Sequence, residues 1–433
     1  MRPSTPSRIK RPSTGPEGRI ARWRGLPLRV AFVIGLAELG FATIIPLLPL
    51  YLTERLGASV KMVGMVVAAF ALVETVMKTA WGSLADRVGR RPMIIGGLLL
   101  SSLTPFAMSL LRTPWLFVPL RLLDGGGSSA LWPAAAAVIA DTTPPHQRAA
   151  AMGTLNMFFL SGLALGPSLG LYAVALSGTY AAGFYLAGVV LFAAALISGV
   201  ALRGLGATHL MAPPRPPART EEIGYHGAAP NPRLEEVVES ARRYPLFLSM
   251  LVVAFLQMFG AGLLAPILVI YARRVVGLSE HVIGTLFLLL LLSVAAASVP
   301  SGRLADRWGK LRSMAWGMAL ASLGMWILPV SPVLSVLVAA AFVLGVGYAL
   351  AAPAWHAMVS EIAPPGRTAF ALGTFQTAQG LGLVLGPLLG GLLWDEMGSS
   401  APFVGAAVLL SLGTILLLVA ARRAGSTAPA GPR

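Results

Sequence analysis

The sequence of 433 residues contains no cysteine and few charged residues, which make up 12% of the chain. The missing cysteines exclude disulfide bonds and thiolate metal ligands. Soluble proteins carry roughly 25% charged residues, whereas 56% of the residues here are hydrophobic. Acidic residues are especially scarce, with 17 Asp and Glu against 33 Lys and Arg. The composition therefore predicts an integral membrane protein with a basic bias.

Long apolar segments follow one another along most of the chain. A helix needs about 20 apolar residues to cross the hydrocarbon core of a bilayer, and we expect twelve such spans. They cover residues 28–52, 61–84, 92–111, 115–140, 150–176, 180–202, 245–271, 281–302, 313–330, 333–360, 369–394 and 401–421.

The net charge of +16 could indicate a nucleic-acid-binding protein. The position of the basic residues favours another explanation. If the N-terminus is cytoplasmic, most of the Lys and Arg residues fall in cytoplasmic segments, which is the positive-inside bias of multi-pass proteins. We therefore expect a protein of the cytoplasmic membrane with both termini cytoplasmic, surrounded by lipid, and no nucleic-acid partner.

One polar segment, rich in proline at its centre, interrupts the apolar pattern in mid-chain. It predicts a linker between two bundles. The expected organisation is a basic cytoplasmic tail at 1–27, a six-helix bundle at 28–203, a cytoplasmic linker at 204–244 with a short surface helix at 234–243, a second six-helix bundle at 245–421, and a cytoplasmic tail at 422–433.

The two bundles are copies of one unit. The segment GSLADRVGRR, which begins at Gly82, recurs 220 positions later as GRLADRWGK, which begins at Gly302. Pro46 and Pro266, and likewise Gly64 and Gly284, match at the same offset. Duplicated hydrophobic bundles are typical of secondary transporters, whose substrate site lies between the repeats near the middle of the membrane.

The repeated segment resembles the G-x-L-a-D-r-x-G-r-r loop of the major facilitator superfamily. That resemblance implies two pseudo-symmetric six-helix bundles, an all-α membrane fold, and transport by alternating access. It also implies that Asp86 latches the cytoplasmic ends of the bundles in the outward-facing state, and that Arg90 pairs with Asp141. A plain tight turn is the alternative explanation. The motif residues are Gly82, Asp86, Arg87, Gly89, Arg90 and Arg91 with Asp141, and in the second copy Gly302, Asp306, Arg307 and Gly309.

A second motif lies in the fifth and eleventh spans. It resembles the G-x-x-x-G-P-x-x-G-G signature of drug:proton antiporters, although the first copy has Leu171 in place of the last glycine. The ending P-L-L-P-L-Y at 46–51 is similar to that of twelve-span drug exporters. Close packing of membrane helices through small residues is the alternative explanation. The motif residues are Gly162, Gly166, Pro167 and Gly170, then Gly382, Gly386, Pro387 and Gly390.

Charged side chains inside the spans are candidates for the transport chemistry, because each costs on the order of 3 kcal/mol unless it is paired or hydrated. Glu38 and Glu74 each lie about ten residues from the cytoplasmic end of a span, hence about 15 Å deep. Asp124 reaches a similar depth. Glu38 has no local partner and is the first candidate for a proton or cation site.

The other two acids have basic neighbours one helical turn away. Glu74 and Lys78 are spaced for a structural ion pair, and so are Arg121 and Asp124. The sequence around Arg121 is also similar to the R-x-x-q-G element that the family links to proton coupling, with Asp124 where an amide is common. Both roles stay open for each pair.

Polar side chains in the second half are Gln257, His356, Gln376 and Gln379. They could line the cavity or bond to a neighbouring helix. No cluster has metal-ligand spacing, and no phosphate-binding loop is present, so no cofactor is expected. A formal G-x-S-x-G match at 166–170 lacks the strand-turn-helix context of a hydrolase, so enzymatic activity is not expected.

These observations predict a monomeric, proton-coupled antiporter that exports amphipathic, cationic small molecules, of the multidrug efflux type. A carboxylate that holds either a proton or a cationic substrate would exchange one for the other. A proton-coupled symporter that imports a sugar or an organic acid is the second hypothesis. A membrane sensor that binds its ligand without moving it is the third.

Overall fold

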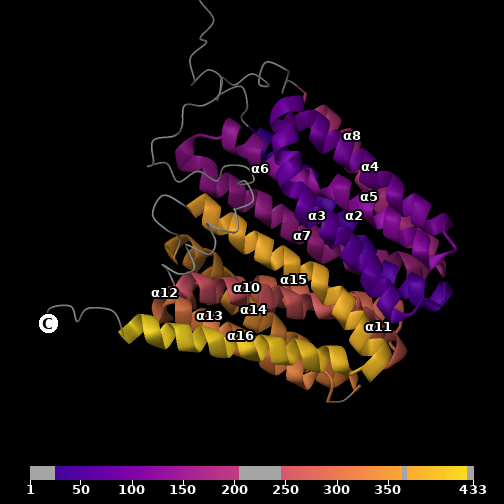
Figure 1. Cartoon of the computed structure of the whole chain (residues 1–433). Coiled ribbons are helices and arrows are strands. Elements are labelled where there is room, and N and C mark those ends of the chain that lie inside the picture. The colour runs from indigo at the N-terminus through magenta and orange to yellow at the C-terminus, as the bar shows by residue number, and fades with distance from the viewer. Residues whose placement is uncertain (1–24, 204–244, 331, 363–367, 427–433) are drawn as a thin grey trace, which may run out of the picture.

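The computed structural model describes residues 25–203, 245–330, 332–362 and 368–426, apart from some side chains within the helices. The expected tails and linker helix lie outside these residues. The described residues form two helical bundles, one from each half of the sequence (Figure 1). Counting α5 with α6 and α10 with α11, they contain the twelve helical segments that hydropathy predicts.

The first bundle begins with α2 and ends with α8. Its helices are α2 (Leu26–Leu50), α3 (Val60–Val88), α4 (Arg90–Leu110), α5 (Phe117–Ser129), α6 (Leu131–Thr142), α7 (Pro145–Ser177) and α8 (Tyr180–Ala201), with a π-helical turn η1 (Tyr51–Arg55) and a 3-10 turn η2 (Pro114–Leu116).

The second bundle repeats this order. Its helices are α10 (Pro245–Leu264), α11 (Ile267–Arg274), α12 (Glu280–Trp308), α13 (Lys310–Ile327), α14 (Leu334–Ile362), α15 (Thr368–Met397) and α16 (Ala401–Ser426). The last helix continues past the expected end of the bundle at 421.

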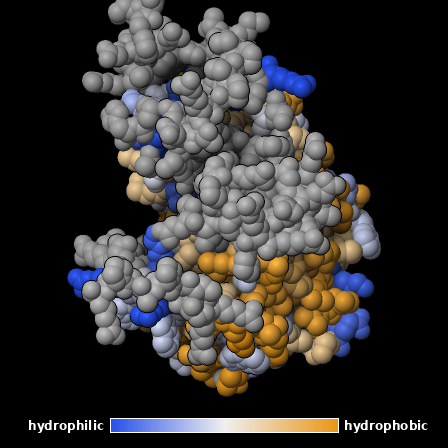
Figure 2. Space-filling view, turned by 60° about the vertical axis from the view of Figure 1, so that its left-hand side comes forward, coloured by the Kyte–Doolittle hydropathy of each residue, from blue (hydrophilic) through white to orange (hydrophobic). Residues whose placement is uncertain are grey.

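Large apolar side chains are exposed on helices of both bundles, and Figure 2 shows a broad hydrophobic area, in orange, on one face of the molecule. In the described part of the chain, nine helical segments are long and apolar enough to cross a membrane. The remaining segments are shorter, as in α5 and α6, or contain charged residues near their ends, as in α12 and α13. A lipid environment explains why so many leucines are exposed.

Two expected spans are broken helices. The span expected at 115–140 divides at Ala130 into α5 and α6, and the span expected at 245–271 divides at Ala265 and Pro266 into α10 and α11. Pro133 lies in the first turn of α6, where its missing N–H leaves no helical bond unmade, and the glycines at 125–127 weaken the end of α5. Local sequence thus explains breaks that hydropathy does not detect.

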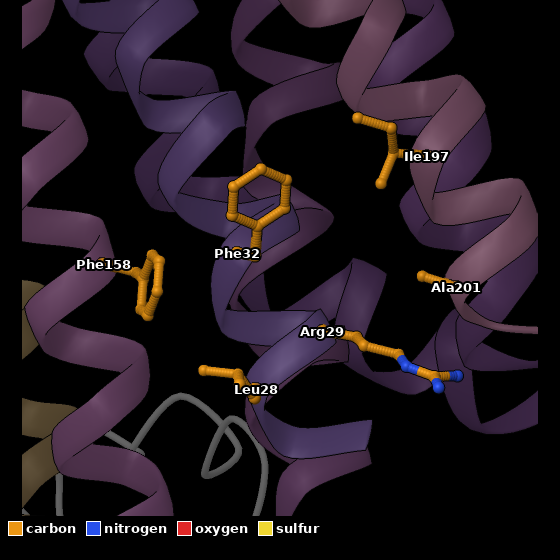
Figure 3. Close-up of a pocket in the computed structure, with 6 residues that line it drawn as sticks. All are labelled: Leu28, Arg29, Phe32, Phe158, Ile197 and Ala201. Carbon is orange, nitrogen blue, oxygen red and sulfur yellow. The ribbon is translucent and has the colours of Figure 1, made fainter. Parts of the chain in front are cut away.

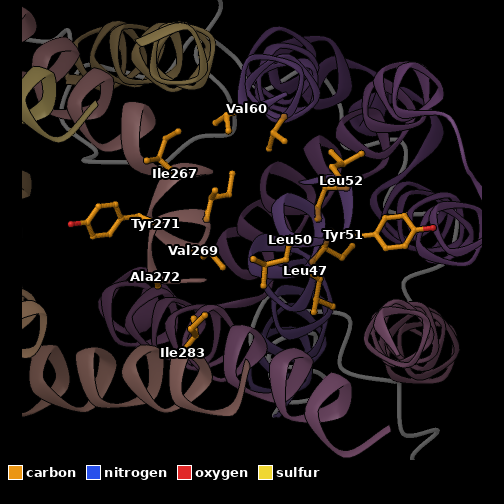
Figure 4. Packing of buried hydrophobic residues seen from close by; sticks show 14 of the residues in the cluster. Leu47, Leu50, Tyr51, Leu52, Val60, Ile267, Val269, Tyr271, Ala272 and Ile283 are labelled. Carbon is orange, nitrogen blue, oxygen red and sulfur yellow. The ribbon is translucent and has the colours of Figure 1, made fainter. Parts of the chain in front are cut away.

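The helical bundles have two distinct ends. We call the end with the turns at Gly89 and Gly309 the motif end, and the end with η1, the start of α3 and the end of α11 the far end. At the far end, one hydrophobic core contains residues of both halves, among them Leu47 and Tyr51 of α2 and η1, and Ile267 and Tyr271 of α11 (Figure 4).

Toward the motif end, each half has a core of its own. One cluster, which includes Ile139 and Leu202, comes only from the first half. Another, which includes Phe247 and Met358, comes only from the second. The described halves therefore share their buried apolar surface at the far end and not at the motif end.

Asp395 of α15 joins the two halves by capping α3. Its carboxylate accepts hydrogen bonds from the backbone N–H of Val60 (3.2 Å) and of Lys61 (2.8 Å), while Ser59 accepts from Met62 N–H (3.2 Å). The first N–H groups of a helix have no partner within it and carry a partial positive charge. A carboxylate from the other half satisfies that need.

An ion-pair network closes the same end. Glu54 accepts from Arg273 of α11 (2.9 Å) and from the hydroxyl of Tyr180 (2.8 Å), and Arg273 also pairs with Glu280 (3.1 Å). Arg274 donates to the backbone carbonyl of Thr53 (2.7 Å). Deeper, the Ser168 hydroxyl donates to the carbonyl of Gly284 (2.7 Å). Polar bonds between the halves thus surround their shared core.

Helices α3 and α15 touch backbone to backbone at this end. A Cβ added at Gly64 would lie 2.2 Å from the carbonyl oxygen of Pro387, and one added at Gly391 would lie 2.6 Å from that of Val60. Real carbon–oxygen contacts are never so short, so the closed far end requires glycine at both positions.

We expect Gly64→Ala to disfavour the closed far end, because the new methyl group meets a backbone carbonyl that cannot rotate away. Overpacking of this kind costs about 1–3 kcal/mol. The chain has no cysteine, so labels at Leu176→Cys and Met397→Cys, both exposed, can report the distance between the halves by pulsed electron resonance. The mean distance should lengthen. Gly96→Ala is the matched control, because a Cβ there meets nothing within 4 Å; equal distances in both variants would contradict the prediction.

Candidate functional site

Glu38 lies midway along α2, partly buried, where that helix packs against α7. A Cβ added at Gly162 of α7 would lie 3.0 Å from the Cβ of Glu38. The charges of Glu74 and Lys78 on α3 both act on Glu38. Among the described residues, no cation forms an ion pair with it.

Glu74 and Lys78 form the ion pair that their spacing predicts, with 2.9 Å between Oε1 and Nζ. Both side chains stay accessible, with exposed fractions of 32% and 41%. The neighbouring Thr75 contacts α15, since a Cβ added at Gly380 would lie 2.4 Å from its methyl group. The pair therefore lies beside the contact between the halves and is open to solvent or ligand.

Arg121 and Asp124 form a second ion pair on α5, and this one is buried. The Arg121 guanidinium also lies 3.9 Å from the centre of the Phe70 ring of α3. Within the described structure, Arg121 Nε and Asp124 Oδ1 have no hydrogen-bond partner. The Ser101 hydroxyl donates to the Asp124 backbone carbonyl (3.3 Å).

The two pairs and Glu38 form one electrostatic cluster, because Glu74 acts on Glu38 and also on Arg121. Three carboxylates and two cations on three helices of the first half therefore influence one another electrostatically. If all five groups are ionised, one negative charge is uncompensated. A cluster with that balance suits a proton or a cation as its exchangeable partner.

The second half contributes amides. Gln257 of α10 and Gln379 of α15 are partly buried, and Gln376 is exposed one turn from Gln379. Gln379 precedes Gly380, where an added Cβ would meet Thr75, so Gln379 belongs to the segment of α15 that packs beside the Glu74–Lys78 pair. The side chain of His356 on α14 lies outside the described residues, and its role stays a prediction.

The repeated loop forms the same turn in both halves. Gly89 (φ 103°) separates α3 from α4, and Gly309 (φ 88°) separates α12 from α13. Only glycine adopts such angles readily. Gly82 and Gly302 lie within α3 and α12, one to two turns earlier.

At the first turn, Arg90 of α4 pairs with Asp141 of α6, and Arg91 donates to the Gly199 carbonyl of α8 (3.0 Å). Arg87 and Arg307 are exposed. The side chains of Asp86 and Asp306 lie outside the described residues, so the latch that the resemblance implies stays a prediction.

The glycine motif of α7 and α15 forms close helix contacts. A Cβ added at Gly162 would lie 2.2 Å from the Gly35 carbonyl of α2, and one added at Gly390 would lie 2.2 Å from the Leu263 carbonyl of α10. Gly166, Gly170, Gly382 and Gly386 make similar approaches, and Pro167 and Pro387 lie inside their helices. Tight packing alone thus requires small residues here.

The sequence did not reveal the far-end contacts of Glu54, Arg273 and Asp395. Each is a charged residue at the end of an expected span, and such positions are common for residues that only meet water. Their pairing depends on how the halves meet, which no local pattern records.

A family model for the Major Facilitator Superfamily matches residues 30–259 and 250–433, nearly the whole chain. The chain belongs to the major facilitator superfamily. The separate matches to the two halves agree with the duplication, and membership identifies a multi-pass secondary transporter of small molecules and not an enzyme.

Relatives of this major facilitator protein include drug-resistance proteins. It is 24% identical over 398 residues to quinolone resistance protein NorA of Staphylococcus aureus (strain MRSA252). That alignment covers 90% of this chain and 94% of that protein. It is 25% identical over 390 residues to multidrug resistance protein 2 of Bacillus subtilis (strain 168), covering 89% and 92%.

Solved structures share the fold. A bacterial homolog of the human lysosomal transporter Spinster, inward-facing and occupied, matches with a TM-score of 0.72 at 17% identity, over 95% of this chain and 99% of that one. The peptide transporter POT with alafosfalin matches with a TM-score of 0.74 at 17% identity, over 92% and 94%.

The two ion pairs of this transporter should differ in their effect on stability. Arg121→Met strands a buried carboxylate, which costs about 3–5 kcal/mol, and the double variant Arg121→Met/Asp124→Leu should recover most of that loss. Lys78→Met leaves Glu74 accessible to water, so it should cost no more than about 1 kcal/mol. Thermal unfolding in detergent measures all three. Equal losses for Arg121→Met and Lys78→Met would contradict the contrast in burial.

Proposed function

We propose that this chain is a proton-coupled antiporter of the cytoplasmic membrane that exports amphipathic, cationic small molecules. The observation that carries the proposal is the cluster around Glu38. It contains a carboxylate without a directly paired cation, beside an accessible Glu74–Lys78 pair, and so supports the proposal.

Exchange follows from charge balance. A proton on Glu38 neutralises the excess negative charge of the cluster, and a bound cation does the same. Both cannot be favourable together, because a low-dielectric site strongly resists a net charge of either sign. Release of the proton therefore promotes binding of the cation, and protonation promotes its departure. The accessible Glu74–Lys78 pair gives the substrate a route to Glu38.

Two further observations support efflux. The relatives from Staphylococcus aureus and Bacillus subtilis are named for resistance to quinolones and to multiple drugs, and each aligns over about nine-tenths of the chain. The Phe70 ring of α3, which lies 3.9 Å from the Arg121 guanidinium and one helical turn before Glu74, suits the apolar part of an amphipathic substrate.

The positive-inside bias supports a cytoplasmic motif end. With that orientation the halves, which share their core at the opposite end, would open toward the cytoplasm. In that state the cluster would load substrate from the cytoplasm, as an exporter requires.

The accessible ammonium of Lys78 supports a second candidate, proton-coupled uptake of an organic anion. In that case Lys78 would bind the substrate, and Glu74 would take up the proton when the ion pair opens.

The test is transport by purified protein in liposomes with an imposed pH gradient. Glu38→Gln should abolish gradient-driven movement of a lipophilic cationic dye, while dye binding persists, because the amide keeps its hydrogen bonds and cannot titrate. Glu396→Gln, the same change at an exposed end of α15, is the matched control.

The same liposomes separate the two candidates. Dye-dependent proton flux that disappears in Glu38→Gln supports antiport. Proton flux that requires an organic acid and disappears in Lys78→Gln supports uptake instead. Undiminished gradient-driven dye export in Glu38→Gln would overturn the role of Glu38.

A further inference from the structure

A groove on the first half lies outside the charged cluster. It has a volume of about 330 Å³ and lies near the motif end, where α2 is exposed between α7 and α8 (Figure 3). Its lining is Leu28, Arg29 and Phe32 of α2, Phe158 of α7, and Ile197 and Ala201 of α8.

Apart from Arg29, the lining is apolar and much of it is exposed. Leu28 is 55% exposed and Phe32 is 46% exposed, and the rings of Phe32 and Phe158 meet edge to face with centroids 6.3 Å apart. In a membrane-spanning helix, exposed apolar side chains face lipid chains. The groove is therefore a surface that an acyl chain can fill.

Its rim is basic. Arg29 lies in the first turn of α2, at the start of this span, and its side chain is exposed. Figure 3 shows the guanidinium extending from α2 toward Ala201. Arg203, two residues past the end of α8, is also exposed. The sequences of α7, α8 and the first 12 residues of α2 contain no acid, so these positive charges have no local counter-charge in those helices.

We propose that the groove binds one anionic phospholipid, with its phosphate on Arg29 and an acyl chain between Phe32 and Ile197. Charge complementarity selects the headgroup, since basic residues at a membrane surface attract anionic lipids. The apolar lining selects the chain. The proposal depends on membership of a membrane-protein family and not on the direction or substrate of transport.

The bound lipid would touch the helix seam that positions Glu38. A Cβ added at Gly35 would lie 2.8 Å from the carbonyl of Phe158, so groove and seam share this residue of α7. Glu38 follows Arg29 by nine residues, about 13 Å along α2. Lipid in the groove is thus placed to stabilise the packing of α2 on α7.

The test is native mass spectrometry of the full chain released from nanodiscs that contain equal amounts of phosphatidylglycerol and phosphatidylcholine. The protein should retain phosphatidylglycerol selectively. Arg29→Gln should lower that occupancy about fivefold, the effect of one basic residue at a membrane surface, and Arg29→Lys should restore most of it. Arg112→Gln, an exposed arginine beyond the other end of α4, is the charge-matched control.

A second variant tests the groove itself. Ala201→Phe fills it without altering charge and should lower phosphatidylglycerol retention, whereas Ala175→Phe, at an exposed site near the other end of α7, should not. If Arg29→Gln lowers phosphatidylglycerol retention and Ala201→Phe does not, the groove is not the binding site, and attraction of the headgroup alone explains the retention. Equal retention of both lipids would also overturn the proposal, and is the result expected if the chain's own residues 1–24 fill the groove. Thermal unfolding of each variant excludes misfolding as the cause of a loss.

Discussion

The contact of α3 with α15 at the far end is the constraint on which the arrangement of the two halves depends. Gly64 and Gly391 let the two backbones touch, and Asp395 then reaches the start of α3. The shared apolar core and the Glu54–Arg273 pair follow from that approach. Because the other two cores each belong to a single half, this end is where the described halves share their buried apolar surface.

The internal duplication accounts for the helices that make this contact but not for the polar residues that form its hydrogen bonds. The position of Asp395 corresponds to Ala175 in the first half, and that of Val60 corresponds to Glu280 in the second. Helix α12 thus begins with its own acid, whereas α3 receives one from α15. Both arrangements place negative charge at a helix N-terminus, where the partial positive charge of the backbone favours it. Of these two arrangements, only the capping of α3 by Asp395 joins one half to the other.

The structural features that the sequence predicted correctly are those that short-range patterns encode. Hydropathy gave the spans, the glycines at 89 and 309 gave the turns, and the four-residue spacing gave the Glu74–Lys78 pair. Hydropathy did not predict the helix breaks at Ala130 and Ala265, because an average over about 20 residues is not sensitive to a single proline. The contacts of Glu54 and Asp395 with the other half were not predicted, for a different reason. Arg273, Val60 and Lys61 lie more than 200 residues away in sequence, and only the packing of the halves brings them to Glu54 and Asp395.

The distribution of charge gives the two copies different tasks. Glu38, Glu74, Lys78, Arg121 and Asp124 correspond in the second half to Met258, Val294, Ser298, Ala341 and Leu344. Every charged member of the cluster is therefore absent from the second copy, although the turns, the prolines and the glycine seams are retained. Buried charge is costly in a membrane and persists only where it has a use. The second half keeps the scaffold of the repeat, and only the first half carries this set of charged groups. The proposed exchange therefore needs titratable groups from only one half, while the other half offers amides such as Gln379.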